Sequence, residues 1–256
     1  MSYADSSRKN GSNTAIIVIA ILGGLCFVLM VCGGIMAALL IPAVQSAREA
    51  ARRMQCSNNM KQIALALLNY ESAYKQFPPA YTVDQEGNRL HSWRTAILPF
   101  LEKTQVYGKI DWTKPWNHPS NAFALDAEVP FYQCPSTDVP KGFTTYVALV
   151  DQQGVFFGSG QTKMREITDG TANTLLVGET TKGKAVHWMD PSDSDLDSFI
   201  AALTGPDIPT DRRAHVGGSN VVFVDGSVRF LSSRISAESL RAMVTRDGGE
   251  KVIADY

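Results

Sequence analysis

The sequence predicts an α+β protein that begins with a transmembrane helix. Residues 15–41 contain no charged residue, the apolar residues that follow have helical spacing, and the later half changes to short strand-like runs separated by turns. The chain has 256 residues, of which 45% are hydrophobic and 19% charged, which excludes a wholly disordered protein. Its net charge of −1 gives no overall indication of nucleic-acid binding, so we expect no nucleic-acid partner.

The apolar run is long enough to cross a lipid bilayer. A helix over residues 15–41 would span roughly 40 Å at about 1.5 Å per residue. The hydrocarbon core is only roughly 30 Å thick. A cleaved signal peptide has a shorter apolar core, of about 7–15 residues. We therefore expect a polar tail over 1–14, a single transmembrane helix over 15–41 and a domain over 42–256, with the bilayer as the first partner.

The charges beside the apolar run give a weak orientation. Arg8 and Lys9 precede it, and Arg48, Arg52 and Arg53 follow it. By the positive-inside rule this count mildly favours a cytoplasmic C-terminal side. Residues 42–61 are net basic and residues 62–256 net acidic, as in a domain beside an anionic lipid surface.

A long helix is expected to continue past Pro42. Its apolar stripe shifts near Cys56, where the helix is expected to meet a globular body, and Phe77-Pro78-Pro79 should end it. The stripe consists of Cys56, Met60, Ile63, Leu67, Tyr70 and Tyr74.

The remaining chain reads as short helices and strands. A short helix is expected over 93–102, and a final helix over 237–244 with Ser236 as its N-cap. Asp225-Gly226 predicts a two-residue type I′ hairpin turn, and the acidic run 190–197 predicts an exposed loop. Strands are expected over 144–150, 155–157, 173–177, 220–224 and 227–231.

Several blocks resemble one bacterial family. The run LLIPAVQSAREAARRMQCSNNMKQIALALLNY, residues 39–70, is similar to the start of a PulG-like family with prepilin-type N-termini, the domain-of-unknown-function family 1559. The similarity continues through SWRTAILPFLE at 92–102 and ITDGTANTLLVGE at 167–179. It includes the H-x9-DG motif, here His215 followed by Asp225-Gly226, and covers about residues 39–252.

The resemblance implies a pilin-like fold and a location. The long helix would pack on an antiparallel sheet, with the body outside the cytoplasmic membrane and the N-terminus in the cytoplasm, which outweighs the charge count. Family members usually carry a cleavage glycine and a glutamate five residues later. Here Ala20 and Leu25 stand at those positions, so we expect an uncleaved anchor, and incorporation into a filament is not favoured.

The four cysteines fall into two pairs of different character. Cys26 and Cys32 lie within the apolar run and are expected to be inert. Cys56 and Cys134 belong to family blocks, and an extracytoplasmic body is in an oxidising compartment, so the resemblance implies a disulfide between them. The alternative is a pair of buried thiols.

The family motif is expected to be structural. A lone histidine without neighbouring ligand motifs is a poor metal site, so His215 is expected to bond to backbone or to a carboxylate. Asp225-Gly226 is explained by the hairpin. The block at 167–179 adds four motif residues with the same expectation: Asp169, Gly170, Asn173 and Glu179.

Motifs for metal binding and catalysis are weak or absent. Two runs space oxygens at i, i+2 and i+4, one beginning at Asp169 and one at Asp193, but neither meets EF-hand requirements, and a turn and a solvated loop are the simpler interpretations. The sequence has no G-x-S-x-G, H-E-x-x-H or phosphate-binding G-x-x-x-x-G-K motif. We expect no enzyme activity, no metal and no cofactor, although a catalytic set assembled from distant residues stays open.

The sequence therefore favours a membrane-anchored, pilin-like protein with a structural or assembly role at the cell envelope. Expected partners are envelope or secretion-apparatus proteins, and self-association is a further expectation. The alternative is a transport-related or solute-binding module, since the family has also been described as transport-related. A hydrolytic enzyme ranks third.

Overall fold

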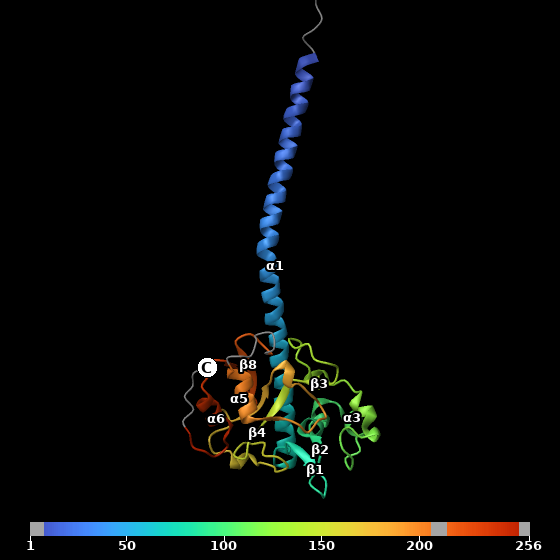
Figure 1. Ribbon diagram of the computed structural model, residues 1–256, viewed down its shortest axis with the longest axis vertical. Helices are drawn as coiled ribbons and strands as arrows, with labels where there is room; N and C mark the ends of the chain where they lie inside the picture. Colours follow the sequence, from blue (N-terminus) through green and yellow to red (C-terminus); the bar gives the residue numbers. More distant parts are fainter. Residues whose placement is uncertain (1–7, 206–213, 251–256) are drawn as a thin grey trace, which may run out of the picture. The chain divides into compact units, whose positions relative to one another are not determined.

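The computed structural model describes residues 8–205 and 214–250 and divides the chain into two compact units. The first unit is residues 1–50 and the second, which we call the body, is residues 51–256. A single helix, α1 (Arg8–Tyr74), contributes to both, as Figure 1 shows.

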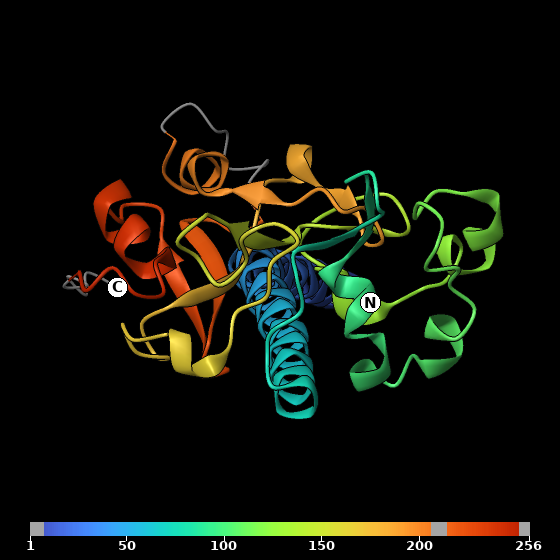
Figure 2. The ribbon, with the colours of Figure 1, turned by 90° about the horizontal axis from the view of Figure 1, so that it is seen from below.

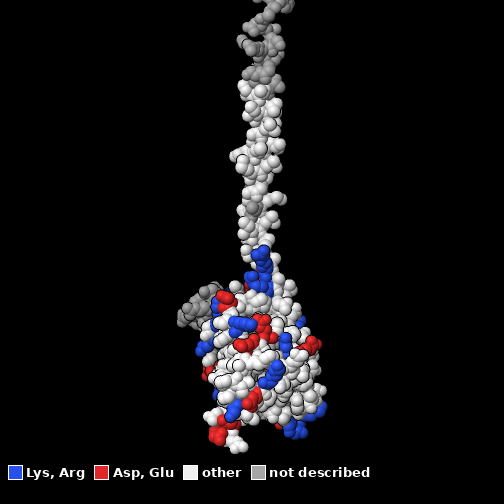
Figure 3. Space-filling model, turned by 90° about the vertical axis from the view of Figure 1, so that its right-hand side faces the viewer, with Lys and Arg blue, Asp and Glu red and all other residues white. Residues whose placement is uncertain are grey.

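The described residues of the first unit belong to α1 and include its apolar run. The helix continues through Pro42 and is long and apolar enough, by length and composition, to cross a membrane. Its large apolar side chains are exposed, with Met30 at 72% and Leu39 at 71%. Cys26 and Cys32 are both free. Figure 3 shows the absence of charged side chains along the described apolar stretch.

The last turns of α1 belong to the core of the body. Cys56, Met60, Ile63 and Leu67 are each 0% exposed, which confirms the predicted apolar stripe. The stripe ends sooner than expected, because Tyr74 is 56% exposed. The helix itself ends just before Lys75, which has a φ of 62°.

A five-stranded sheet forms the centre of the body. Its order is β7-β4-β5-β8-β9, and two small sheets pair β1 with β2 and β3 with β6. Neighbouring strands are antiparallel except β4 and β7, which are parallel. The strands are β1 Tyr81–Val83, β2 Arg89–Ser92, β3 Phe143–Thr144, β4 Tyr146–Val150, β5 Leu175–Glu179, β6 Val186–His187, β7 Ser194–Asp195, β8 Gly218–Phe223 and β9 Val228–Ser232.

Short helices surround this sheet. Figure 2 shows α6, in red, and the segment with α3 and α4, in green, at opposite sides of the body. The α-helices after α1 are α2 Trp93–Ala96, α3 Thr104–Tyr107, α4 Ala122–Leu125, α5 Leu196–Thr204 and α6 Ala237–Val244. The 3-10 helices are η1 Leu98–Leu101, η2 Pro119–Asn121, η3 Pro130–Tyr132, η4 Met164–Glu166 and η5 Lys182–Lys184.

The sheet is covered on both faces. Because side chains alternate along a strand, Ala148 and Val222 join one core cluster with α1, whereas Leu149 and Phe223 join a second cluster with α5 and α6. The predicted α+β class, with a long helix on a largely antiparallel sheet, is confirmed. The layer of α5 and α6 on the second face was not predicted.

Two local predictions are corrected. The run 155–157 forms no strand; Phe156 makes only an isolated bridge to Val150. The run 190–197 is not an exposed loop, because it contains β7 and the start of α5. Asp193 is buried there, with its side chain 2% exposed.

The β8–β9 turn is a three-residue loop rather than the predicted type I′ turn. Gly226 N donates to Phe223 O at 3.0 Å, and Phe223 N donates to Ser227 O at 2.9 Å. Gly226 has a φ of 83°, whereas Asp225 is not among the described residues with positive φ. This is a turn followed by a left-handed glycine, the geometry of a bulged hairpin.

Candidate functional site

A disulfide joins α1 to the segment after η3. Cys56 and Cys134 are bonded, with their Cα atoms 4.9 Å apart and 78 residues apart in sequence. Both are buried, at 0% and 2% exposed. The predicted pairing is confirmed.

Beside this disulfide lies a buried histidine–carboxylate pair. His215 Nε2 lies 3.2 Å from Glu179 Oε2, and the two side chains are 1% and 0% exposed. Glu179 is the last residue of β5, and His215 lies just before β8. Of the two kinds of partner expected for His215, backbone or carboxylate, the structure shows a carboxylate.

The neighbouring strand holds Glu179 in place. Asn220 donates to Glu179 Oε2 from its backbone N at 2.9 Å and from its Nδ2 at 2.8 Å. Ser219 Oγ donates to the Glu179 carbonyl at 2.7 Å. No described residue donates a hydrogen bond to Glu179 Oε1, which is buried. Oε2 therefore has hydrogen-bond donors within the protein, whereas Oε1 has none among the described residues.

The pair and the disulfide converge on one point. His215 Nε2 also lies 3.8 Å from Cys134 Sγ. The potential ligand atoms of Cys56, Cys134, Glu179 and His215 all lie within 4.8 Å of one another. We call these four residues the Cys–His–Glu cluster. The sequence singled out all four, but as a disulfide and separate motif residues, because only the fold brings them together.

The geometry of this cluster does not favour a catalytic relay. A relay histidine contacts its acid through one ring nitrogen and its nucleophile through the other. Here Glu179 and Cys134 both lie against Nε2 of His215, and the Cys134 sulfur is bonded to Cys56. The arrangement instead places several potential metal-ligand atoms around a common centre.

Tyr146 completes the surroundings of the cluster. It pairs with Glu179 across β4 and β5, and its hydroxyl donates to the Cys56 carbonyl at 3.4 Å. Burial, followed by the negative charge of Glu179, raises the pKa of Tyr146 well above 10. The phenol therefore stays protonated at neutral pH and acts as a hydrogen-bond donor.

A cavity reaches the cluster from one side. It has a volume of about 380 Å³, and its lining includes Gln55, Phe131 and Cys134. Asn59, also in the lining, donates through Nδ2 to Gln133 O at 2.8 Å and so ties α1 to the segment that carries the disulfide. The disulfide thus lies at the edge of an open space.

The other family-motif residues have structural contacts. Asp169 accepts from Gly248 N at 2.8 Å and from Gly249 N at 2.9 Å, one on each carboxylate oxygen. Asn173 Nδ2 donates to Asp169 O at 3.1 Å, and Gly170 has a φ of 96°. Since both Asp169 oxygens bind backbone amides, these contacts agree with a turn rather than a calcium loop.

The two parts of the H-x9-DG motif do not meet. His215 precedes β8 and Asp225-Gly226 follows it. Asp225 N donates to Thr171 O at 2.9 Å, which joins the hairpin turn to the family block at 167–179. The histidine belongs to the Cys–His–Glu cluster, and the Asp-Gly pair fixes a turn.

The aspartates of the second acidic run, which begins at Asp193, do not converge on one point. Asp193 pairs with Arg94, Asp195 caps α5 by accepting from Ser198 N at 2.8 Å, and Asp197 pairs with Arg241. Three carboxylates with three different partners do not form a calcium site.

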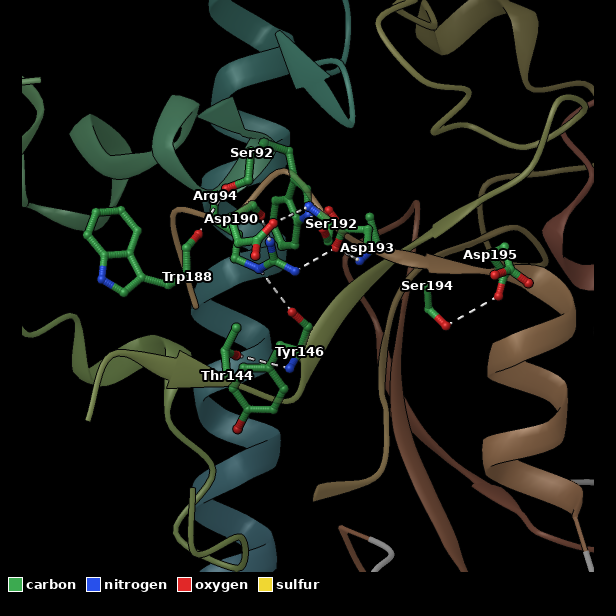
Figure 4. A network of polar contacts seen from close by, with 12 residues as sticks. Ser92, Arg94, Thr144, Tyr146, Trp188, Asp190, Ser192, Asp193, Ser194 and Asp195 are labelled. Atoms are coloured by element: carbon green, nitrogen blue, oxygen red, sulfur yellow. Dashed lines mark hydrogen bonds and ion pairs between the residues drawn. The ribbon is translucent and has the colours of Figure 1, made fainter. Parts of the chain in front are cut away.

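The pair of Arg94 and Asp193 is the second buried polar feature, shown in Figure 4. Arg94 Nη2 lies 2.5 Å from Asp193 Oδ1, and the side chains are 0% and 2% exposed. The same oxygen accepts from Ala148 N at 2.8 Å and from Trp93 Nε1 at 3.2 Å. Arg94 Nε donates to Tyr146 O at 3.0 Å. Sequence reasoning missed this pair.

Asp193 has an unusual carboxylate environment. Burial raises its pKa to about 6, although the charge of Arg94 acts in the opposite direction. No described residue donates to its Oδ2. Asp193 lines a cavity of about 190 Å³, whose other lining residues include Thr180, Lys184 and Ser194.

Comparison with known families places the chain. A family model described as "Protein of unknown function (DUF1559)" matches residues 45–153 and 138–205, more than half of the chain. The chain belongs to this family. No curated protein and no solved structure matches it. The match includes Cys56, Cys134 and Glu179 and ends before His215, and the family description assigns no activity to any of them.

Proposed function

We propose that this DUF1559 protein is a single-pass membrane protein whose pilin-like body has a structural or assembly role on the outer side of the cytoplasmic membrane. The observation that carries this proposal is α1, which contains both the apolar run and six residues of the body's core. A helix with these two parts, together with a largely antiparallel sheet, is what a pilin-like protein requires. We propose envelope or secretion-apparatus proteins, or further copies of the chain, as its partners.

The disulfide supports the proposed side of the membrane. Structural disulfides persist in oxidising compartments and are rare in the cytosol. Cys56 and Cys134 are buried in the body and bonded, so a body outside the membrane is consistent with their state. This argument outweighs the mild charge asymmetry beside the apolar run.

The chemistry of the body supports a non-catalytic role. The histidine that most resembles a catalytic base is buried against Glu179, and Glu179 and Cys134 both lie at its Nε2. We therefore propose that the body works as a scaffold, with the disulfide and the buried polar pairs fixing its core.

Accessibility of one introduced cysteine tests the proposed topology. In a chain carrying Cys26→Ser and Cys32→Ser, we would place the probe at Lys141, whose side chain is 66% exposed. A membrane-impermeant maleimide should label Lys141→Cys in intact spheroplasts. The matched control is a cysteine at Ser2, which should react only after the membrane is opened. The reverse pattern would contradict the proposed orientation.

Association in the membrane tests the proposed role. Crosslinking of native membranes should give specific adducts of the body with itself or with envelope proteins. If the chain remains monomeric and uncrosslinked at its natural abundance, the assembly role is wrong while the topology still stands.

A solute-binding role is the second candidate, and one observation favours it. Asp193 Oδ2 is a buried acceptor without a described donor, and it lies at a cavity of about 190 Å³ that also presents Lys184. A small solute carrying both an ammonium and a carboxylate would match these two charges.

Ligand-dependent melting tests the second candidate. Small amino acids should raise the melting temperature of the chain, and Asp193→Asn should abolish that rise, whereas Asp126→Asn should keep it. An unchanged melting temperature across such solutes would remove this candidate and leave a bound water as the partner of Asp193.

A further inference from the structure

The Cys–His–Glu cluster has the composition of a zinc site. Zinc prefers four ligands drawn from cysteine sulfur, histidine nitrogen and carboxylate oxygen. Cys56, Cys134, Glu179 and His215 supply such a set, all four are buried, and their ligand atoms lie within 4.8 Å of one another. Ligand atoms of a tetrahedral zinc site lie about 3–4 Å apart, given zinc–ligand distances of about 2.0–2.3 Å. Small side-chain shifts therefore suffice to complete the site.

The disulfide decides whether this site exists. A sulfur that is bonded to another sulfur is not a thiolate, and the thiolate is the form that binds metal. We infer that reduction of the Cys56–Cys134 disulfide converts the cluster into a tetrahedral Zn²⁺ site formed by Cys56, Cys134, Glu179 and His215. The oxidised protein would hold no metal there.

The chemistry of the conversion balances with a dithiol as reductant. The dithiol gives two electrons and two protons to the disulfide, so that the bond between Cys56 and Cys134 breaks, two thiols form, and the dithiol becomes a disulfide. Zn²⁺ then binds both sulfurs and displaces the two thiol protons to solvent. A small disulfide reverses the process: it takes two electrons from the two thiolates and two protons from solvent to become a dithiol, the bond between Cys56 and Cys134 forms again, and the ion is released.

An unpartnered carboxylate oxygen provides the second observation. Asn220 satisfies Glu179 Oε2 with two hydrogen bonds, but no described residue donates to the buried Oε1. A buried acceptor without a donor destabilises the folded state, because it has lost its hydrogen bonds to water and gained none in the protein. A metal ion bound to Oε1 would remove this cost and leave both hydrogen bonds from Asn220 to Oε2 in place.

The residues around the four ligands act as supports. Metal ligands are usually oriented by hydrogen bonds from a surrounding layer of residues. Asn220 and Ser219 fix Glu179 at its carboxylate and its backbone, and Tyr146 donates to the carbonyl of Cys56. The ligands thus come from four separate segments that the sheet and α1 already hold in place.

The cavity beside Cys134 gives a route to the site. Its volume of about 380 Å³ admits a hydrated ion or the reactive end of a small dithiol. Cys134 is therefore the sulfur we expect a reductant to attack, while Cys56 on α1 is the leaving thiol.

Cobalt binding tests the inference directly. The full chain in detergent, carrying Cys26→Ser and Cys32→Ser so that only the cluster supplies cysteine, is reduced and titrated with Co²⁺ without oxygen. We expect one Co²⁺ per chain, with the sulfur-to-cobalt absorption and the intense visible bands of a tetrahedral site, and displacement by Zn²⁺. The unreduced chain should show none of this.

Ligand variants separate this site from adventitious thiol binding. Asn220→Ala, which keeps all four ligands, should weaken Co²⁺ binding by about 10-fold. Glu179→Gln and His215→Gln, which each remove a ligand, should weaken it further. Matched controls are Glu128→Gln and His118→Gln, both at exposed residues, which should leave binding unchanged. If a ligand variant fails to fold, the Co²⁺ affinity of Asn220→Ala tests the site instead. A second measurement is alkylation of the reduced parent chain, in which Zn²⁺ should protect Cys56 and Cys134 from the reagent.

Three results would overturn the inference. The first is a reduced chain that gives no sulfur-to-cobalt absorption. The second is equal Co²⁺ affinity in the parent, Glu179→Gln and His215→Gln chains, which would mean that the thiols bind alone. The third is equal binding by the oxidised chain. None of them bears on the proposed membrane topology.

Discussion

Arg94 and Asp193 form an ion pair that is almost completely removed from solvent and joins α2 to the residue that precedes β7. Their side chains are 0% and 2% exposed, and they lie 99 residues apart in sequence. Three donors converge on Asp193 Oδ1, and the guanidinium also donates to the carbonyl of Tyr146 in β4. The pair therefore ties α2 and the segment before β7 to β4 of the central sheet.

Breaking this pair should destabilise the body strongly. Arg94→Met leaves the Asp193 carboxylate buried without its cation, and removing one partner of a buried pair costs about 3–5 kcal/mol. Urea unfolding followed by tryptophan fluorescence measures the loss, because all four tryptophans lie in the body. Lys141→Met, which removes the exposed pair with Glu128, is the matched control and should change little. Equal midpoints for the two variants would contradict this prediction.

Asp193 should also give the body a specific pH dependence. Its pKa is raised to about 6 from 3.8 in the unfolded chain, so the native state holds this proton more tightly. The contribution of Asp193 to stability is therefore largest below pH 4 and falls as the pH rises towards 6. Asp193→Asn keeps a carbonyl oxygen for the three donors but cannot ionise.

We expect the free energy of unfolding of Asp193→Asn, relative to the parent, to shift in favour of the variant by about 2 kcal/mol between pH 4 and pH 7. Urea unfolding at both pH values measures this shift. Parallel pH profiles for the two proteins would show that the pKa of Asp193 is not raised.

The outline of the fold was predictable because it rests on local patterns. Ser236 and the helical spacing after it predicted α6 with its observed bounds, and the stripe from Cys56 to Leu67 predicted the buried face of α1. The helix α5 was missed because four aspartates within 190–197 suggested a solvated loop. One of them, Asp195, is the N-cap that starts α5.

The candidate site was predictable only in pieces. The disulfide followed from family resemblance, and for His215 either a backbone or a carboxylate partner was expected. Glu179 became that partner because β5 and β8 are neighbours in the sheet. The register of two strands 40 residues apart, like the pairing of Arg94 with Asp193, depends on tertiary packing that no local pattern encodes. The hairpin turn was wrong in type because Asp-Gly fits both a two-residue and a three-residue loop.

His215 should contribute to stability in the oxidised protein. His215→Ala leaves a buried carboxylate, Glu179, without one of its partners, which costs about 1–3 kcal/mol. For a body of about 200 residues this lowers the melting temperature by several degrees. Thermal melting of the disulfide-bonded chain measures the effect, and His118→Ala, at an exposed residue, is the control. A melting curve identical to that of the parent would show that the contact with Glu179 is not stabilising.

Gly226 should be the most sensitive position of the β8–β9 turn. Its φ is 83°, a conformation that costs a residue with a side chain about 1–2 kcal/mol, and a Cβ there would lie 2.9 Å from Leu68 Cδ1 on α1. Because asparagine tolerates positive φ and β-branched residues resist it, stability should fall in the order Gly, Asn, Ala, Val. Urea unfolding of the three variants measures this order. Gly183→Val is the matched control, since no atom lies within 4 Å of a Cβ at Gly183 and its φ is not in the left-handed region. If Gly226→Asn were as unstable as Gly226→Val, the loss of stability would come from the contact with Leu68 and not from the backbone conformation. The conclusion that this turn requires a glycine for its left-handed conformation would then be wrong.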